Sequence, residues 1–340
     1  MASITLQGLV PLLQTTPEFT KLCDELKHGS LSPGEDPLAL QLLGAARPFV
    51  AAAIATTLNQ PLVIITARPD TALQFQEKMK LFLDDPSRLI YYSDPGVLPY
   101  ERAPWSSERV QSRLTVLTEL LSDEHSPIVI TSAQAILQPT IPRDWFERNV
   151  RRYEVGKTIS LRFLLASWYT MGYTKVNTVL EPGQYAHRGG ILDIFPTNAR
   201  NLYPVRLELW GDEIDSIRTF DPLSQRSLKQ LKHVTIPPSS EALFHRNQKD
   251  AVRRLRALDY STCVEEVQQA FTEDIRRIEE DERFDGLEFY LPYLYDQCGD
   301  FFDYLPENAL VLIDDWTGLE LNVGDIESKA LERRNDMIMR

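Results

Sequence analysis

The segment 183–196 reads GQYAHRGGILDIFP and places one cationic side chain beside two glycines. Because Gly189 and Gly190 carry no side chains, the guanidinium of Arg188 stands clear of its neighbours. A free guanidinium forms paired hydrogen bonds with a carboxylate of another molecule. An arginine combined with an aromatic residue, here Phe195, is also typical of an interface hot spot. The segment predicts protein binding; the simpler alternative is a core Phe195 and an ordinary surface Arg188.

Other residue types argue against metal and nucleic-acid chemistry. Cys23, Cys263 and Cys298 form no CxxC pair and have no histidine at metal spacing. They therefore predict no zinc site and favour a reducing cytoplasm. An aromatic set has the composition of a base-stacking platform, but its domain is acidic, which favours a packing role. This set comprises Tyr91, Tyr92, Tyr100 and Trp105.

Length and charge narrow the class of protein. The 340 residues suggest two or three domains, and the apolar runs are too short to span a membrane. The net charge is −13, yet residues 143–238 hold 14 basic and 10 acidic side chains. An acidic surface repels the phosphate backbone, so nucleic-acid binding over the whole surface is excluded. The uneven charge predicts a middle domain with a partner of its own.

The first 140 residues alternate strands with helices. Strands are expected at 61–67, 88–92 and 126–131, and helices at 40–58, 71–83 and 107–121. This order predicts an α/β fold with a parallel sheet covered by helices. The apolar run 308–315 predicts a further strand of the same sheet, which makes the middle of the chain an insertion.

The middle segment has the pattern of a small α+β domain. A helix is expected at 161–171, followed by strands at 175–179, 190–195, 204–210 and 213–220, with a hairpin turn at Gly211 and Asp212. A charged helical region at 246–284 predicts a solvated face. The last helix, from 327 onward, has no C-cap, and we expect a fragment of a longer protein.

Five motifs together carry a family resemblance. They are VLPYERAPWS (97–106), RVQSRLTVL (109–117), the segment 183–196, WGDEIDSIRTFD (210–221) and SQRS (224–227). In this order they resemble the bacterial transcription-repair coupling factors (Mfd), in the part of these proteins that is homologous to the excision-repair protein UvrB. The resemblance covers nearly the whole chain.

The resemblance implies a specific architecture. It is a helicase-like (RecA-like) parallel-sheet domain that is split in sequence, with a small α+β UvrA-binding domain inserted between its halves. We expect the first half at 1–142, the inserted domain at 143–238 and the second half, ending in a truncated helix, at 239–340.

The resemblance also implies a nucleotide site, because UvrB is an ATPase. A phosphate-binding loop needs the pattern GxxxxGK[ST]. The equivalent segment here is LLGAARPFVA (42–51), in which Gly44 remains but no Gly-Lys-Ser/Thr follows. Pro48 also removes a backbone donor, and Arg47 lacks the loop that would direct it to a phosphate.

The second nucleotide motif is altered in the same way. In YLPENALVLIDDWT (304–317), Asp314 matches the Mg²⁺-coordinating acid, while Asp315 replaces the family's glutamate. A shorter acid would change where a hydrolytic water is polarised. The resemblance therefore implies a degenerate nucleotide site at Gly44, Arg47, Asp314 and Asp315. We expect no catalysis, cofactor or metal, and the chain leaves no room for UvrB's DNA-clamping hairpin.

The resemblance places the UvrA-docking surface on the inserted domain. Arg188 and Phe195 are expected on it, with the turn Tyr173, Thr174 and Lys175 beside them. Arg206, which alternates with Glu208 on one strand, is expected to extend this surface.

The implied function is a non-catalytic adaptor that recruits UvrA to RNA polymerase stalled at a lesion. RNA polymerase and DNA would be contacted only by downstream domains, and a C-terminal part would mask the docking surface. One alternative is a divergent UvrB-like, DNA-dependent ATPase that verifies damage. Another is an autoinhibitory brace for a downstream motor, with no repair partner.

Overall fold

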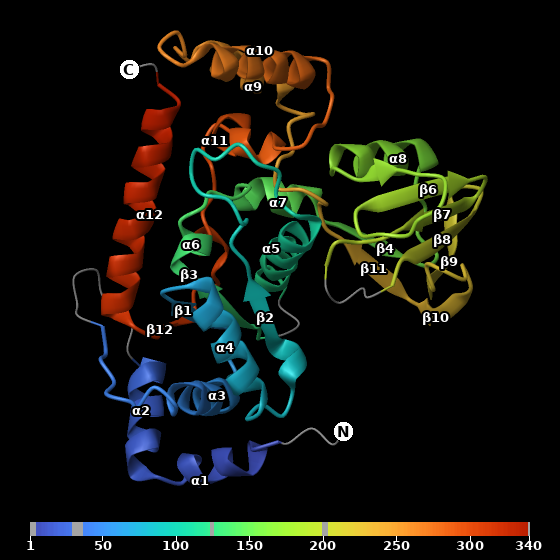
Figure 1. Cartoon of the computed structure of the whole chain (residues 1–340). Coiled ribbons are helices and arrows are strands. Elements are labelled where there is room, and N and C mark those ends of the chain that lie inside the picture. Colours follow the sequence, from blue (N-terminus) through green and yellow to red (C-terminus); the bar gives the residue numbers. More distant parts are fainter. Residues whose placement is uncertain (1–4, 29–36, 123–125, 199–202, 339–340) are drawn as a thin grey trace. The chain divides into compact units, whose positions relative to one another are not determined.

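The computed structural model describes residues 5–28, 37–122, 126–198 and 203–338 (Figure 1). The chain forms two compact units. The first comprises Met1–Ser93, Ser122–Ala135 and Leu305–Gly324, and the second comprises Asp94–Leu121, Ile136–Tyr304 and Asp325–Arg340. Each unit is thus assembled from three chain segments, and the domain boundaries expected at residues 142 and 238 stay predictions.

A parallel sheet of four strands is the centre of the first unit. Its strands are β1 (Leu62–Thr66), β2 (Leu89–Tyr92), β3 (Ile128–Ser132) and β12 (Leu310–Ile313), in the order β12-β1-β3-β2. Figure 1 shows β12, from the far end of the chain, beside β1. Leu62 pairs with Leu310 and Ile65 with Ile313. The apolar run at 308–315 therefore joins the first sheet, as its sequence predicts.

Helices cover one face of this sheet. They are α1 (Val10–Gln14), α2 (Pro17–His28), α3 (Arg47–Leu58) and α4 (Pro69–Lys80); the first turns of α12 (Trp316–Asp336) also belong to this unit. Ala52 of α3 and Phe75 and Met79 of α4 pack with Ile64 and Ile130 of the strands. Helix α3 begins at Arg47, later than the predicted residue 40, because Pro48 is suited to a first helical turn and not to a helix interior.

A mixed sheet of six strands dominates the second unit. Its order is β10-β9-β8-β7-β6-β5, and all neighbours are antiparallel except β5 and β6. The strands are β5 (Thr174–Lys175), β6 (Gln184–Arg188), β7 (Ile191–Ile194), β8 (Val205–Trp210), β9 (Glu213–Phe220) and β10 (Ser227–Leu231). A separate pair joins β4 (Arg151–Glu154) to β11 (His233–Ile236). The strand expected at 175–179 is wrong beyond Lys175, because the last backbone bond to β6 is the one from Val176 to Tyr185 and residues 177–179 leave the ladder.

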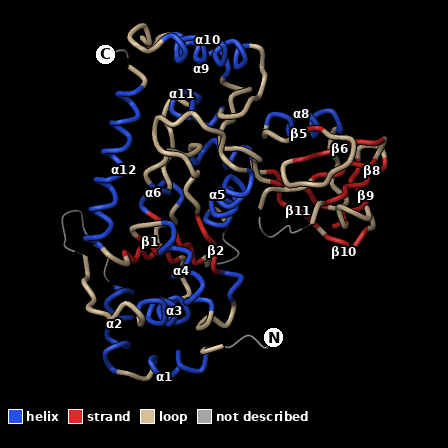
Figure 2. Tube along the Cα trace, in the orientation of Figure 1, coloured by secondary structure: helices blue, strands red, loops and turns tan. Residues whose placement is uncertain are grey.

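Helix α8 (Leu161–Thr170) covers one face of the six-stranded sheet (Figure 2). Trp168 of α8 is fully buried, and its indole Nε1 donates to the Tyr153 hydroxyl over 3.1 Å. Leu192, Leu207 and Ile217 reach the same core from β7, β8 and β9. Because side chains alternate along a strand, the residues between them lie on the opposite face.

Helices from distant segments complete the second unit. They are α5 (Ser107–Leu120), α7 (Arg143–Asn149), α9 (Gln248–Arg256), α10 (Glu265–Glu279), α11 (Leu291–Leu294) and the end of α12; the short α6 (Ala133–Ile136) spans the division between the two units. The charged region at 246–284 forms two helices, α9 and α10. Asp259 accepts a hydrogen bond from the Ser261 backbone in the turn between them, so the helical pattern is broken there.

His245 follows the fully buried Phe244, and its environment makes stability sensitive to pH. Its ring lies 4.7 Å from the Tyr169 ring and 4.5 Å from the Phe244 ring, and Nδ1 contacts Asp281. Burial lowers the pKa of His245 below its ordinary value of 6.5, an effect opposed by Asp281. The unfolded chain therefore binds the proton more readily than the folded chain.

We expect the burial of neutral His245 to contribute fully to the free energy of unfolding above pH 6.5. This contribution is lost as the pH falls toward the lowered pKa of His245. Equilibrium denaturation of the parent and a His245→Gln variant at pH 7.5 and pH 5.5 measures it. The parent should lose more unfolding free energy than the variant between these pH values. An equal loss in both proteins would contradict the assignment.

Candidate partner-binding face

One row of side chains crosses the six-stranded sheet on the face opposite α8. Arg188 of β6 pairs with Ile191 of β7, Ile191 with Glu208 of β8, and Glu208 with Ser216 of β9. Residues paired directly across a sheet point to the same side. The register therefore places a cation, an apolar side chain and an anion next to one another.

Arg188 is followed directly by the tight turn between β6 and β7, which depends on Gly189 and Gly190. Gly189 adopts a φ of +60°, a conformation that favours glycine. A side chain at Gly190 would lie 2.7 Å from the carbonyl oxygen of Leu209, so a glycine is needed there as well. Both glycines of the motif thus have a structural reason.

The guanidinium of Arg188 is exposed and only partly used. Its Nη2 donates to the carbonyl oxygen of Asn177 and lies 3.4 Å from the Thr178 hydroxyl. Within the described part of the chain, these contacts leave Nε and Nη1 available to a carboxylate of a partner. The two contacts also hold the side chain in place, which reduces the entropy lost on binding.

Thr174 and Lys175 lie on the same edge of the sheet as Arg188. Both are exposed, and they pair in parallel with Gln184 and Tyr185 of β6. The Thr174 backbone N–H donates to the Gly183 carbonyl over 2.8 Å. Thr174 shares the side of Gln184 and Arg188, whereas Lys175 shares the side of Tyr185, which packs with α8. The structure therefore brings Thr174 next to Arg188 on one face, and a role of either residue in UvrA binding stays a prediction.

Tyr173 and Phe195 lie below the surface. Tyr173 is 2% exposed, and its hydroxyl donates to the Pro237 carbonyl over 2.8 Å. Burial raises the pKa of Tyr173 above its ordinary value. Phe195 is 7% exposed and packs with Val179, Ala186 and Phe220. Both residues support the surface by packing. Their burial opposes the predicted direct contact with a partner.

Arg206 belongs to the next row of the same face and is occupied internally. Its Nε and Nη2 donate to the two carboxylate oxygens of Asp193 over 2.6 and 2.9 Å. The guanidinium also lies 4.5 Å from the centre of the Phe220 ring. The hydrogen bond with Asp193 raises the pKa of Arg206. Arg206 therefore orders the face and has little capacity left for another molecule.

The sequence patterns do not identify three exposed or half-exposed residues of this face as site residues. Ile191 and Trp210 are 41% and 84% exposed, and Arg218 donates to Glu208 over 2.9 Å. The alternation that predicts strand 204–210 also places Trp210 on the side of Glu208. The sequence therefore indicates the face on which Trp210 lies, but it does not indicate that Trp210 is exposed.

Two of the four residues of the predicted nucleotide site, Arg47 and Asp314, contact each other in the first unit. Nη1 of Arg47 donates to the backbone carbonyl of Asp314 over 2.8 Å and lies 3.2 Å from its carboxylate. Asp315 accepts a hydrogen bond from the Gly318 backbone at the start of α12. A side chain at Gly44 would meet nothing within 4 Å. Arg47 thus pairs with Asp314, the residue that the resemblance matches to a Mg²⁺-coordinating acid.

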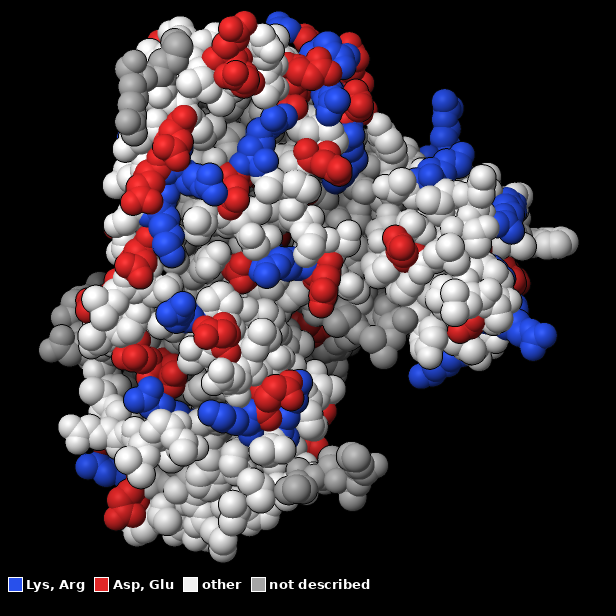
Figure 3. All heavy atoms as spheres, viewed as in Figure 1, with Lys and Arg blue, Asp and Glu red and all other residues white. Residues whose placement is uncertain are grey.

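Neither metal ligands nor a membrane helix is found in the described ranges. No group of three or more His, Cys, Asp or Glu there could hold a metal ion, and no helix there is long and apolar enough to cross a membrane. The cysteines are free thiols. On the face that Figure 3 shows, basic and acidic side chains intermix.

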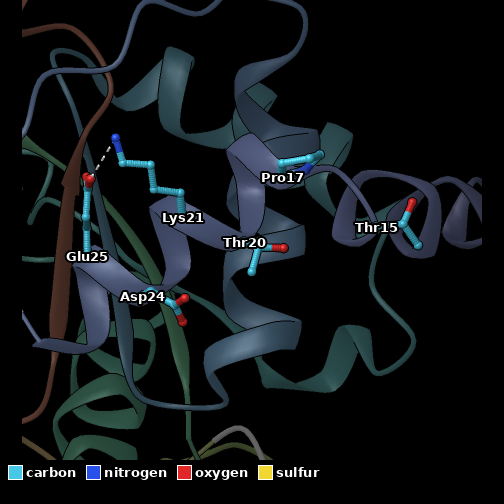
Figure 4. A pocket seen from close by; sticks show the side chains of 6 residues that line it. All are labelled: Thr15, Pro17, Thr20, Lys21, Asp24 and Glu25. Atoms are coloured by element: carbon cyan, nitrogen blue, oxygen red, sulfur yellow. Dashed lines mark ion pairs between the residues drawn. The ribbon is translucent and has the colours of Figure 1, made fainter.

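A surface depression on α2 and its approach contains none of the predicted site residues. Figure 4 shows Lys21 directed toward Glu25, with which it pairs over 3.7 Å. The lining residues are Thr15, Pro17, Thr20, Lys21, Asp24 and Glu25.

Comparison with known proteins agrees with the sequence motifs. A family model described as UvrB interaction domain matches residues 152–241, a range that holds the whole candidate face. The chain is 28% identical over 319 residues to a transcription-repair-coupling factor of Bacillus subtilis, covering 91% of this chain and 26% of that protein. For the Escherichia coli protein of the same name the identity is 27%, over 90% of this chain and 25% of that protein.

A second group of relatives carries another name. The chain is 28% identical to UvrABC system protein B of Legionella pneumophila, covering 83% of this chain and 47% of that protein. The chain therefore spans about a quarter of the coupling factors and about half of the UvrABC proteins that it matches.

Proposed function

The chain is a UvrB-homology module of the kind found in transcription-repair coupling factors, and on this premise we propose that it is a non-catalytic adaptor that binds UvrA. In this proposal it acts in the cytoplasm and presents to UvrA the docking domain that UvrB also carries. Recruitment of UvrA to a lesion-stalled RNA polymerase is then the role of the longer protein. Its other regions would contact RNA polymerase and DNA, and could mask the docking face.

The observation that carries the proposal is the exposed Arg188 on a preorganised face. The guanidinium is held by Asn177 and Thr178, and it lies on the same edge as Lys175. An exposed cation on this face of a net acidic protein favours a partner surface that offers carboxylates. The ion pairs of Arg206 and Arg218 keep the face beside them ordered.

The test is titration of purified UvrA into the 340-residue chain, followed by calorimetry. Saturable binding supports the adaptor function. Absence of binding by a folded chain contradicts it and favours the brace, which needs no repair partner.

The lack of catalysis in this proposal rests on the Arg47–Asp314 pair. The guanidinium of Arg47 already occupies one oxygen of the Asp314 carboxylate, and the segment before α3 offers no P-loop lysine for the phosphates. We expect no ATP hydrolysis above the buffer blank, with Mg²⁺ and DNA present.

A coupled phosphate-release assay measures this expectation. UvrABC system protein B serves as the positive control, and an Asp314→Asn variant serves as the matched negative. ATP turnover by the parent chain that is lost in Asp314→Asn would contradict the proposal and revive the ATPase alternative.

A further inference from the structure

Trp210 lies at the end of the sheet where Arg188 turns toward β7. The Leu209 backbone N–H donates to the Gly190 carbonyl over 2.8 Å, so the tip of β8 is bonded to the glycine turn beside Arg188. Ile191, the direct neighbour of Arg188, pairs with Glu208, which precedes Trp210 by two positions. Arg188, Ile191 and Trp210 therefore occupy one end of one face.

The indole of Trp210 is unusually exposed for its size. Trp210 is 84% exposed, although a large aromatic side chain normally buries most of its surface in a folded protein. The side chain thus adds little to the packing of the domain. Tryptophan and arginine are the residue types most enriched among side chains that dominate protein interfaces.

The surroundings of Trp210 favour a protein partner over a nucleic acid. Glu213 pairs directly with Trp210 across the hairpin, and Asp212 occupies the turn between them. These acids repel the phosphates that would accompany a stacked base. Arg188, at the other side of the row, attracts a carboxylate.

We propose that Trp210 is the aromatic anchor of the UvrA-binding face, an inference that rests on the proposed function. The matching site on UvrA is an apolar pocket that takes the indole, with a carboxylate beside it for Arg188. Ile191 lies between Trp210 and Arg188 and excludes water from the contacts that these two side chains make with UvrA. The family match to residues 152–241 includes all three residues, so the anchor and the cation belong to the same domain.

The test compares UvrA binding by the parent chain and by Trp210→Ala, Trp210→Phe and Leu223→Ala. Leu223 is the matched control because it is 88% exposed and follows the opposite end of β9. We expect Trp210→Ala to weaken binding at least 30-fold, Trp210→Phe to retain most of the affinity, and Leu223→Ala to stay within 2-fold of the parent. All variants should unfold at the parent's temperature.

The outcomes separate the inference from the proposed function. If the parent and Trp210→Ala bind UvrA equally while Arg188→Ala binds weakly, the anchor is wrong and the adaptor function stands. If the parent does not bind UvrA, both are wrong. A parent chain that dimerises in sedimentation velocity and becomes monomeric as Trp210→Ala would show that a second copy covers Trp210, which also overturns the inference.

Discussion

Replacement of Arg113 by alanine is expected to lower the free energy of unfolding by about 3–5 kcal/mol. Arg113 of α5 and Glu241 are both fully buried, with Nε to Oε1 at 2.6 Å and Nη2 to Oε2 at 3.1 Å. The guanidinium also lies 5.1 Å from the centre of the Trp105 ring. Removal of the cation leaves the Glu241 carboxylate without its charged partner in the interior, which is the costly state.

Chemical denaturation at pH 7 measures this effect. Arg148→Ala is the control, because the Arg148–Asp144 pair has a similar length of 2.7 Å but is exposed, and we expect a change within about 0.5 kcal/mol. The double variant Arg113→Met with Glu241→Leu should recover much of the loss, since it buries no unpaired charge. Equal losses in Arg113→Ala and Arg148→Ala would contradict this account.

Replacement of Arg188 by alanine is expected to weaken UvrA binding by about 1.5–3 kcal/mol, the scale of a hydrogen bond to a charged group. The variant removes the exposed guanidinium and keeps the two glycines that shape the turn. Arg188→Lys should recover part of the affinity, because it restores the charge but not the paired hydrogen bonds. Isothermal titration of UvrA measures both variants.

Arg162→Ala is the matched control for Arg188. Arg162 is also an exposed arginine of the same domain, but it lies on α8, the helix that covers the other face of the sheet. Binding should change less than 2-fold in this variant. If Arg162→Ala and Arg188→Ala weaken binding equally, net charge and not the Arg188 face controls association.

Much of the fold follows from local pattern. The apolar runs at 61–67, 126–131 and 308–315 predict strands of one parallel sheet, and β1, β3 and β12 are found there. Strands β1 and β3 are buried, whereas Val311 and Ile313 of β12 are partly exposed. The hairpin at Gly211 is signalled by alternation on both sides of a Gly-Asp turn. Strands β4, β6, β10 and β11 were not predicted, because their pairing depends on neighbours that sequence periodicity does not identify.

The candidate site was predicted less completely than the fold. Arg188 is identified by two adjacent glycines, a local signal. Phe195 and Trp210 are both aromatic residues in strand patterns, and only the register shows that the first packs against Phe220 while the second is exposed. The Arg47–Asp314 contact joins residues 267 positions apart, so it follows from the pairing of β12 with β1.

Competition between this chain and UvrB for UvrA tests the central claim most directly. Labelled chain is bound to UvrA at a fixed concentration, and unlabelled UvrB is added while fluorescence anisotropy reports the bound fraction. If the chain presents the docking domain that UvrB also carries, UvrB should displace it completely, and unlabelled parent chain should do the same. A complex in which UvrA holds the chain and UvrB together, or a chain that never binds UvrA, would contradict the account.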